Sequence, residues 1–172
     1  MGKGYIHLYT GDGKGKTTAA LGLTIRAVGA GLKVAFFQFF KDGTSSEVKI
    51  LKKLSPQVCY KNFGKKGFYR DKIPSDLERK LKEGWEEVKK MVKSKEYNII
   101  VLDEITHVLN KGIINLEEFI NFLKEKPEDI EIILTGRDAS VKLIEIADLV
   151  TEAKKIKHYF DKGVKARKGI EK

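Results

Sequence analysis

The sequence has little cysteine or proline and no long hydrophobic run. Cys59 is the only cysteine among 172 residues, which excludes an intrachain disulfide and a cysteine-based zinc site. No apolar run approaches the ~20 residues that a transmembrane helix needs. The chain opens Met1-Gly2-Lys3-Gly4, without an apolar signal segment. We therefore expect a cytoplasmic protein that has no membrane span.

Acidic residues are outnumbered by basic ones. Lys and Arg total 34 against 24 Asp and Glu, which gives a formal net charge of +10. This excess suits a polyanionic ligand such as nucleic acid, nucleotide phosphates or an acidic surface. The alternative is a solvated surface, because Lys and Glu are both abundant and the charge is spread along the chain. The charge alone does not separate these interpretations.

The length fits a single domain, residues 1–172. Short apolar runs alternate with longer segments of helical period, and several runs are apolar throughout, as in strands buried on both faces of a parallel sheet. The expected strands are Tyr5–Thr10, Lys33–Phe40, Gln57–Asn62, Asn98–Leu102, Glu131–Thr135 and Leu149–Glu152. This alternation predicts a three-layer α/β domain with right-handed crossovers and a mostly parallel sheet of about six strands.

Two segments between these strands show helical stripes. The longer stripe consists of Leu77, Leu81, Trp85, Val88 and Val92, whose spacing places them on one helix face. Ser75 and Glu78, which follow Pro74, have the spacing of a capping box. The shorter stripe consists of Leu116, Phe119, Ile120 and Leu123 and ends before Pro127.

Two other segments, Lys41–Glu47 and Phe63–Lys72, fit no element. The second reads Phe-Gly-Lys-Lys-Gly-Phe-Tyr-Arg-Asp-Lys. Glycines beside lysines and aromatics are typical of a mobile loop that closes over a ligand. A solvated surface loop is the alternative.

The first expected strand leads into a glycine-rich loop and then an Ala/Leu-rich helix. The loop reads Thr10-Gly11-Asp12-Gly13-Lys14-Gly15-Lys16-Thr17-Thr18. Glycines let consecutive backbone N–H groups converge on phosphate oxygens, and the helix N-terminus adds a positive dipole. Lys16 supplies a mobile positive charge and the Thr17 hydroxyl a ligand for Mg²⁺. Because Thr10 stands where the consensus has its first glycine, this is a variant phosphate-binding loop.

Asp103 and Glu104 end the apolar strand Ile99-Ile100-Val101-Leu102. Acids at the carboxyl end of a parallel strand beside a phosphate loop hold Mg²⁺ directly or through water. The alternative is an ordinary strand followed by an acidic helix start. The candidate metal ligands are thus Thr17, Asp103 and Glu104, and we favour Glu104 for direct contact.

Arg137 follows the fifth strand in Leu134-Thr135-Gly136-Arg137, and the topology places it at the same sheet edge. Its guanidinium can bind a phosphate through two hydrogen bonds; a surface arginine at a helix start is the alternative. The candidate catalytic residues are Lys16, Thr17, Glu104 and Arg137.

His7, His107 and His158 lack metal-ligand spacing, so we expect each to be structural. No general base stands out, which favours a nucleophile that needs no deprotonation, or a simple ATPase.

These motifs resemble ATP:corrinoid adenosyltransferases of the bacterial cobalamin-salvage type. The likeness begins in Tyr9–Ala20 and continues through Gln38–Lys41, Leu102–Ile105 and Leu134–Arg137. It ends in Ala147–Glu152 and in the pattern His-x-x-Asp-x-Gly-x-Lys-Ala-x-x-Gly-Ile-Glu at residues 158–171. The motifs span essentially the whole chain in order, and the last pattern is far more specific than the phosphate loop.

The resemblance implies a P-loop NTPase-like (RecA-like) sheet, a homodimer and a transferase. The reaction that it implies transfers the 5′-deoxyadenosyl group of MgATP to the Co(I) centre of a corrinoid (cobalamin or a precursor) and releases triphosphate, in adenosylcobalamin biosynthesis or salvage. A separate reductase would supply Co(I). Family members are described as holding the nucleotide in reverse along the loop.

The resemblance also assigns a role to an aromatic loop. Relatives with a Gly-Phe-x-Trp loop use its aromatics to displace the lower axial ligand of cobalt. The corresponding stretch here is Gly67-Phe68-Tyr69-Arg70, which retains the phenylalanine and has arginine in place of tryptophan. Phe68 is therefore the candidate corrinoid contact.

Two other functions remain open at this point. One is a P-loop ATPase or kinase that acts on another small molecule. The other is a nucleic-acid-binding ATPase, which the net charge and lysine-rich tail favour. The lack of interleaved aromatic and basic residues outside Phe63–Lys72 argues against nucleic acid.

Overall fold

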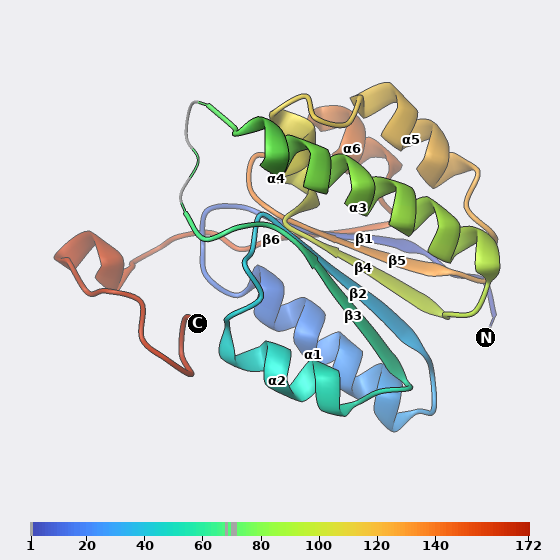
Figure 1. The fold of residues 1–172 in the computed structure, drawn as a ribbon, viewed down its shortest axis with the longest axis horizontal. Helices are drawn as coiled ribbons and strands as arrows, with labels where there is room; N and C mark the ends of the chain where they lie inside the picture. The colour runs from blue at the N-terminus through green and yellow to red at the C-terminus, as the bar shows by residue number, and fades with distance from the viewer. Residues whose placement is uncertain (1, 68, 70–71) are drawn as a thin grey trace.

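The structure, a computed structural model, describes residues 2–67, 69 and 72–172 (Figure 1). Its strands are β1 (Ile6–Thr10), β2 (Val34–Phe39), β3 (Val58–Phe63), β4 (Ile99–Asp103), β5 (Glu131–Thr135) and β6 (Leu149–Glu152). Its helices are α1 (Lys16–Gly29), α2 (Ser46–Lys53), α3 (Ser75–Ser94), α4 (Ile105–Asn110), α5 (Leu116–Lys124), α6 (Val141–Ile146) and the 3₁₀ helix η1 (Tyr159–Lys162). Each expected strand is present, within one residue at either end.

The strands form a six-stranded sheet in the order β3-β2-β4-β5-β1-β6. Every pairing is parallel, so the sheet is wholly parallel where the sequence predicted a mostly parallel one. Helices α1 and α2 cover one face, and α3, α4, α5 and α6 cover the other (Figure 1). This confirms the three-layer, P-loop NTPase-like architecture.

The central strands β2 and β4 are buried along their whole length. Side chains of successive strand residues point to opposite faces. Accordingly, Phe36 packs in the cluster that contains Ala20 and Ala27 of α1, whereas Phe37 and Phe39 pack in the cluster on the α3 side. Their continuous apolar sequences thus reflect a sheet with a core on each face.

Both helical stripes are confirmed. All five residues of the longer stripe are buried on α3, and α5 buries Phe119, Ile120 and Leu123. The capping box, however, is wrong. The helix already begins at Ser75, and the backbone N–H groups of Leu77 and Glu78 bond the Pro74 carbonyl. Glu78 instead accepts a hydrogen bond from Lys82, one turn further along.

The segment Lys41–Glu47 also differs from expectation, because its last two residues already belong to α2. The preceding residues turn sharply through Phe40 and Gly43, which both have positive φ. This turn brings Lys41 back over the carboxyl edge of the sheet, beside β4. Among the described residues, no helix is both long and apolar enough to span a bilayer.

Gly84 provides a test of the packing between α3 and the sheet. A Cβ atom at this buried position would lie 2.5 Å from the Phe63 ring. We expect Gly84→Ala to destabilise the fold by about 1–3 kcal/mol through overpacking. Gly22 is the matched control, because it is exposed in α1 and a Cβ there would have no atom within 4 Å. Gly22→Ala should stabilise by about 0.5–1 kcal/mol. Denaturant unfolding measures both, and equal effects of the same sign would contradict this packing.

Candidate functional site

The glycine-rich loop connects β1 to α1 at the carboxyl edge of the sheet. Gly11 and Gly15 have φ values of 95° and 122°, which residues with a Cβ rarely adopt. The Gly13 N–H donates to the Ala153 carbonyl at 2.5 Å, and a Cβ on Gly13 would lie within 2.5 Å of the same oxygen. The glycines are therefore needed both for the backbone turn and for the close approach of the chain after β6.

The Lys16 ammonium folds back over this loop, where it donates to the carbonyl oxygens of Gly11 at 2.6 Å and Gly13 at 2.8 Å. Burial lowers the pKa of Lys16 and the nearby Arg137 lowers it further, while Glu104 acts in the opposite direction. Lys16 is thus a cation held at the pocket by two neutral oxygens, which a bound anion can replace.

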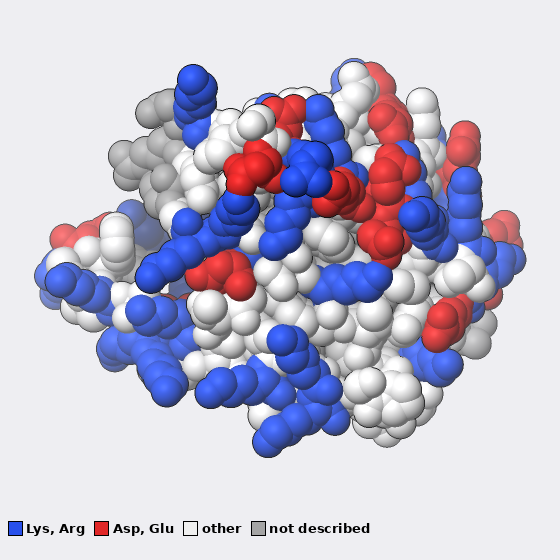
Figure 2. Space-filling view, in the orientation of Figure 1, with Lys and Arg blue, Asp and Glu red and all other residues white. Residues whose placement is uncertain are grey.

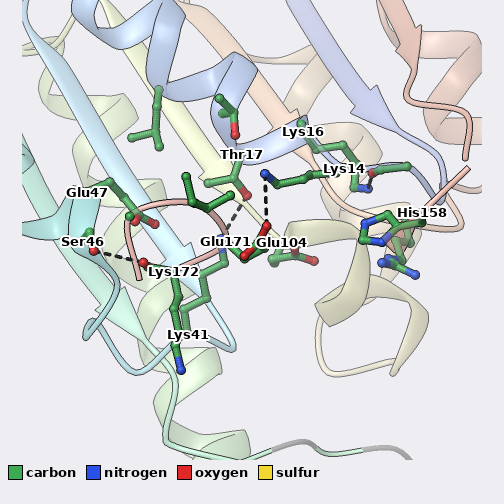
Figure 3. Close-up of a pocket in the computed structure, with 17 residues that line it drawn as sticks. Lys14, Lys16, Thr17, Lys41, Ser46, Glu47, Glu104, His158, Glu171 and Lys172 are labelled. Carbon is green, nitrogen blue, oxygen red and sulfur yellow. Dashed lines mark hydrogen bonds and ion pairs between the residues drawn. The ribbon is translucent and has the colours of Figure 1, made fainter. Parts of the chain in front are cut away.

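A pocket of about 500 Å³ lies at this edge, and eight of the predicted site residues line it (Figure 3). They are Gly13, Lys14, Gly15, Lys16, Thr17, Thr18, Glu104 and Arg137. Asp12 lines an adjoining pocket instead. Thr10, Gly11 and Asp103 line neither of these two pockets, and Phe68 lies outside the described residues.

Asp103 lies beneath the pocket and is completely buried. One carboxylate oxygen, Oδ1, accepts from the Thr17 hydroxyl at 2.9 Å and the Thr135 hydroxyl at 2.7 Å. The other, Oδ2, accepts from Gln38 Nε2 at 3.1 Å and Lys41 Nζ at 2.7 Å. These four donors come from α1, β5, β2 and the turn after β2, so Asp103 connects the elements that form the site.

Glu104 faces the pocket that Asp103 does not reach. Its φ is 62°, and its N–H donates to the Thr135 hydroxyl at 3.0 Å. Burial raises the pKa of Glu104 and the Asp103 carboxylate raises it further, while Lys41 and Lys16 lower it; the net direction is upward. A carboxyl group in this position gains from any added cation.

Two further cations, Arg137 and Lys41, line the same pocket as Glu104. Arg137 lines the pocket from the turn after β5, where its carbonyl accepts from the Thr106 hydroxyl at 2.8 Å. Lys41 donates to Asp103 and, at 3.0 Å, to the Thr17 hydroxyl. Burial alone would lower the pKa of Lys41, but the charge and hydrogen bond of Asp103, together with the charges of Glu104 and Glu47, raise it. The sequence motifs included Lys41 in the family likeness but gave it no role.

A second pocket, of about 740 Å³, adjoins the first and shares Lys41, Glu104, Arg137 and His158 with it. Its other lining residues include four rings, from Phe40, Tyr69, His107 and Phe160. His107 contacts Phe40 edge-to-face, with 4.9 Å between ring centroids. We expected the three histidines to be structural. His7 does pair with Glu131, but the fold brings His107 and His158 together on this pocket wall.

The C-terminal tail forms a wall of the first pocket through Gly169–Lys172. Glu171 lies 3.6 Å from Lys14 Nζ, and the Lys172 carbonyl accepts from the Ser46 hydroxyl at 3.0 Å (Figure 3). Hydrogen bonds from Arg167 and Tyr159 hold the Glu171 carboxylate and lower its pKa. Residue patterns alone gave this lysine-rich tail no place in the fold.

The charges differ between the two sides of the molecule (Figure 2). Acidic and basic side chains alternate over α3, as in the ion pairs Arg79–Glu83 and Lys82–Glu78. Lys and Arg predominate below the sheet in this view, on the side of α1, α2 and the tail. On the face that this view shows, basic side chains therefore gather on the side of the sheet that carries α1.

The Thr135 hydroxyl offers a test of how Glu104 and Asp103 are positioned. Thr135→Val removes a donor to Asp103 and the acceptor of the Glu104 N–H, so we expect a loss of about 1–3 kcal/mol in unfolding free energy. Thr135→Ser retains the hydroxyl and should lose only about 0.8 kcal/mol for one buried methyl group. Denaturant titration compares them. A Val variant as stable as the Ser variant would show that these hydrogen bonds do not hold the two acids.

Comparison with known proteins places this chain in a family. Residues 2–171 match the family described as ATP:corrinoid adenosyltransferase BtuR/CobO/CobP. A corrinoid adenosyltransferase of Sinorhizobium sp is 37% identical over 172 residues, which cover 98% of this chain and 80% of the relative. The corrinoid adenosyltransferase of Escherichia coli K12 is 36% identical over 170 residues, covering 98% and 86%.

The likeness extends to a third relative, the corrinoid adenosyltransferase of Pseudomonas aeruginosa, which is 32% identical over 173 residues that cover 98% of this chain and 84% of the relative. These matches cover almost the whole chain, from residue 2 to residue 171 in the family match, so they do not rest on the phosphate loop alone. The chain belongs to the ATP:corrinoid adenosyltransferase family.

Proposed function

We propose that this protein transfers the 5′-deoxyadenosyl group of ATP to the Co(I) centre of a corrinoid and releases triphosphate, in adenosylcobalamin biosynthesis or salvage. The observation that carries the proposal is the pair of adjoining pockets. One is lined by the phosphate loop and its cations, the other by aromatic rings, and Lys41, Glu104, Arg137 and His158 line both. A transfer between two substrates needs such a common boundary.

The first pocket suits the triphosphate of ATP. Lys14, Lys16, Lys41 and Arg137 bring four cationic side chains to its wall, and fixed cations stabilise the charge that develops on a leaving phosphate. The residues also fit Mg²⁺, a hard ion that prefers oxygen ligands. Thr17 and Glu104 would hold it directly, with Asp103 behind them, and the ion would neutralise phosphate charge.

The reaction needs little acid–base help from the protein. The Co(I) electron pair attacks C5′ of the ribose and forms the cobalt–carbon bond. The C5′–O bond breaks, its electron pair leaves with the triphosphate, and cobalt becomes formally Co(III). Because Co(I) is already a strong nucleophile, the protein contributes orientation, worth ~7–11 kcal/mol in favourable cases, and stabilisation of the leaving oxygens by Lys16 and Arg137.

The second pocket suits the corrinoid, whose ring presents a broad face to aromatic side chains. Phe40, His107 and Phe160 supply rings there. The role of Phe68 in displacing the lower ligand of cobalt stays a prediction, which is supported by the position of its neighbours Gly67 and Tyr69 on the pocket wall.

The proposal includes partners and a compartment. Co(I) requires an electron donor, which we assign to a separate reductase, and we place the reaction in the cytoplasm. We also propose a homodimer. The edge strand β6 supports it, because Leu149 and Val150 are 42% and 40% exposed there, and an apolar sheet edge favours pairing with another chain.

The fate of the phosphates tests the proposed reaction. With ATP, Mg²⁺ and chemically reduced corrinoid under anaerobic conditions, ³¹P NMR should show triphosphate in equal amount to a light-sensitive alkylated corrinoid. Lys16→Ala should slow the transfer by about 10²–10³-fold, as for loss of one charge-stabilising donor. Lys61→Ala, which removes a lysine paired with Glu87 on the surface, is the control and should react normally. ADP and orthophosphate without alkylated corrinoid would instead indicate an ATPase.

The metal role of Glu104 has its own test. Glu104→Gln replaces an anionic ligand with a neutral amide of the same shape, so the Mg²⁺ concentration for half-maximal transfer should rise at least about tenfold, equivalent to about 1.4 kcal/mol. A Mg²⁺ titration of the transfer rate at fixed ATP measures this. An unchanged titration would move direct metal contact to Asp103.

A further inference from the structure

The Lys41 ammonium lies where the start of α1 meets the end of β4. It lies between the Thr17 hydroxyl, at 3.0 Å, and Asp103 Oδ2, at 2.7 Å. The Thr17 hydroxyl in turn donates to Asp103 Oδ1 at 2.9 Å. The three groups form a closed arrangement at the start of α1, in which Lys41 is the cation and the other two supply the oxygens.

Asp103 requires a cation in this position. Its side chain is completely buried, and an unpaired carboxylate would pay a large desolvation cost there. Thr17, Thr135 and Gln38 donate to it as neutral groups. Within the described part of the chain, Lys41 is its one ion-pair partner. Lys41 is therefore the cation in direct contact with the Asp103 carboxylate, at 2.7 Å.

The same oxygens have the chemistry of a divalent metal site. The hydroxyl that follows the phosphate-loop lysine and a carboxylate at the end of a neighbouring strand are hard oxygen donors of the kind that Mg²⁺ selects. The ammonium and a metal ion that binds Thr17 with Asp103 behind it would thus compete for one position. Two cations in close contact there would repel each other.

The Lys41 ammonium also has open space into which it can move. Lys41 lines both pockets, and its side chain is 28% exposed. Lysine has a flexible four-carbon stem. Rotation about its bonds can therefore turn the ammonium from Asp103 toward the space between the two pockets without a change in the backbone. Displaced there, it would meet the phosphates that the first pocket is proposed to hold.

We propose that Lys41 occupies the metal position of the nucleotide-free protein, and that Mg²⁺ arriving with ATP displaces its ammonium from Thr17 and Asp103 onto the triphosphate. This inference rests on the proposed function, because it assumes that the first pocket takes MgATP. The proposal predicts the order in which metal and nucleotide bind. Free metal binds the empty site poorly, and metal enters together with the nucleotide, so the cation of Asp103 is exchanged only when the substrate is present.

Binding of Mn²⁺ without nucleotide tests this proposal, with electron paramagnetic resonance to count free and bound ion. Lys41→Met keeps the length of the side chain and removes its charge. It should bind Mn²⁺ at least about tenfold more tightly than the wild-type protein, a difference of about 1.4 kcal/mol. Lys61→Met makes the same change of charge at the surface pair with Glu87 and should bind Mn²⁺ as the wild type does. Adding Thr17→Val to Lys41→Met should abolish the gain.

The Lys41→Met variant lacks a cation beside Asp103 and is expected to be less stable than the wild type. Thermal unfolding with and without Mn²⁺ therefore gives a second measurement. Mn²⁺ should raise the midpoint of this variant far more than that of the wild type or Lys61→Met. Equal Mn²⁺ affinity in the three proteins, or a Lys41→Met variant that Mn²⁺ does not stabilise, would overturn the proposal.

These measurements use no corrinoid and no transfer step. A wild-type protein that formed no triphosphate would refute the proposed function, whereas the Mn²⁺ result would still report whether Lys41 blocks the metal position. Conversely, normal transfer with unchanged Mn²⁺ binding would refute only the role of Lys41.

Discussion

The buried carboxylate of Asp103 is the interaction on which the site depends. Strand β4 carries it into the centre of the sheet, where four donors from α1, β2, the turn after β2 and β5 converge on two oxygens. A buried charge without these partners would cost several kcal/mol. The fold therefore holds the phosphate loop, the acid pair and Lys41 together, because displacement of one donor without a replacement leaves part of this charge uncompensated.

Adjacent acids perform different tasks because their surroundings differ. Asp103 is enclosed and saturated with donors, whereas Glu104 turns into the pocket through a left-handed backbone conformation. Burial and the neighbouring Asp103 raise the pKa of Glu104, so an incoming cation would stabilise its charged form. One strand end thus supplies both a structural anchor and a group that faces the ligand, and the two pockets meet at that point.

Much of the fold and of the site could be predicted from local sequence patterns. The six strands were expected within one residue at either end, because buried parallel strands need continuous apolar runs. The glycine-rich loop and the residues after β4 and β5 were expected at one edge, since carboxyl ends of parallel strands coincide there. The capping box failed because helix α3 begins one residue earlier than the Ser75–Glu78 spacing requires, a difference that side-chain spacing cannot detect.

Residue patterns along the chain were enough to predict the architecture, the phosphate loop and, through the resemblance of its motifs, the family. Which groups share a pocket depends instead on the three-dimensional arrangement of the elements. Lys41, His107 and the tail residue Glu171 are far apart along the chain and have no spacing that links them. Their proximity arises where the turn after β2, helix α4 and the segment after β6 meet at the carboxyl edge of the sheet. Local propensity acts over a few residues, whereas the proximity of these segments depends on the strand order and on the buried Asp103 carboxylate beneath the site.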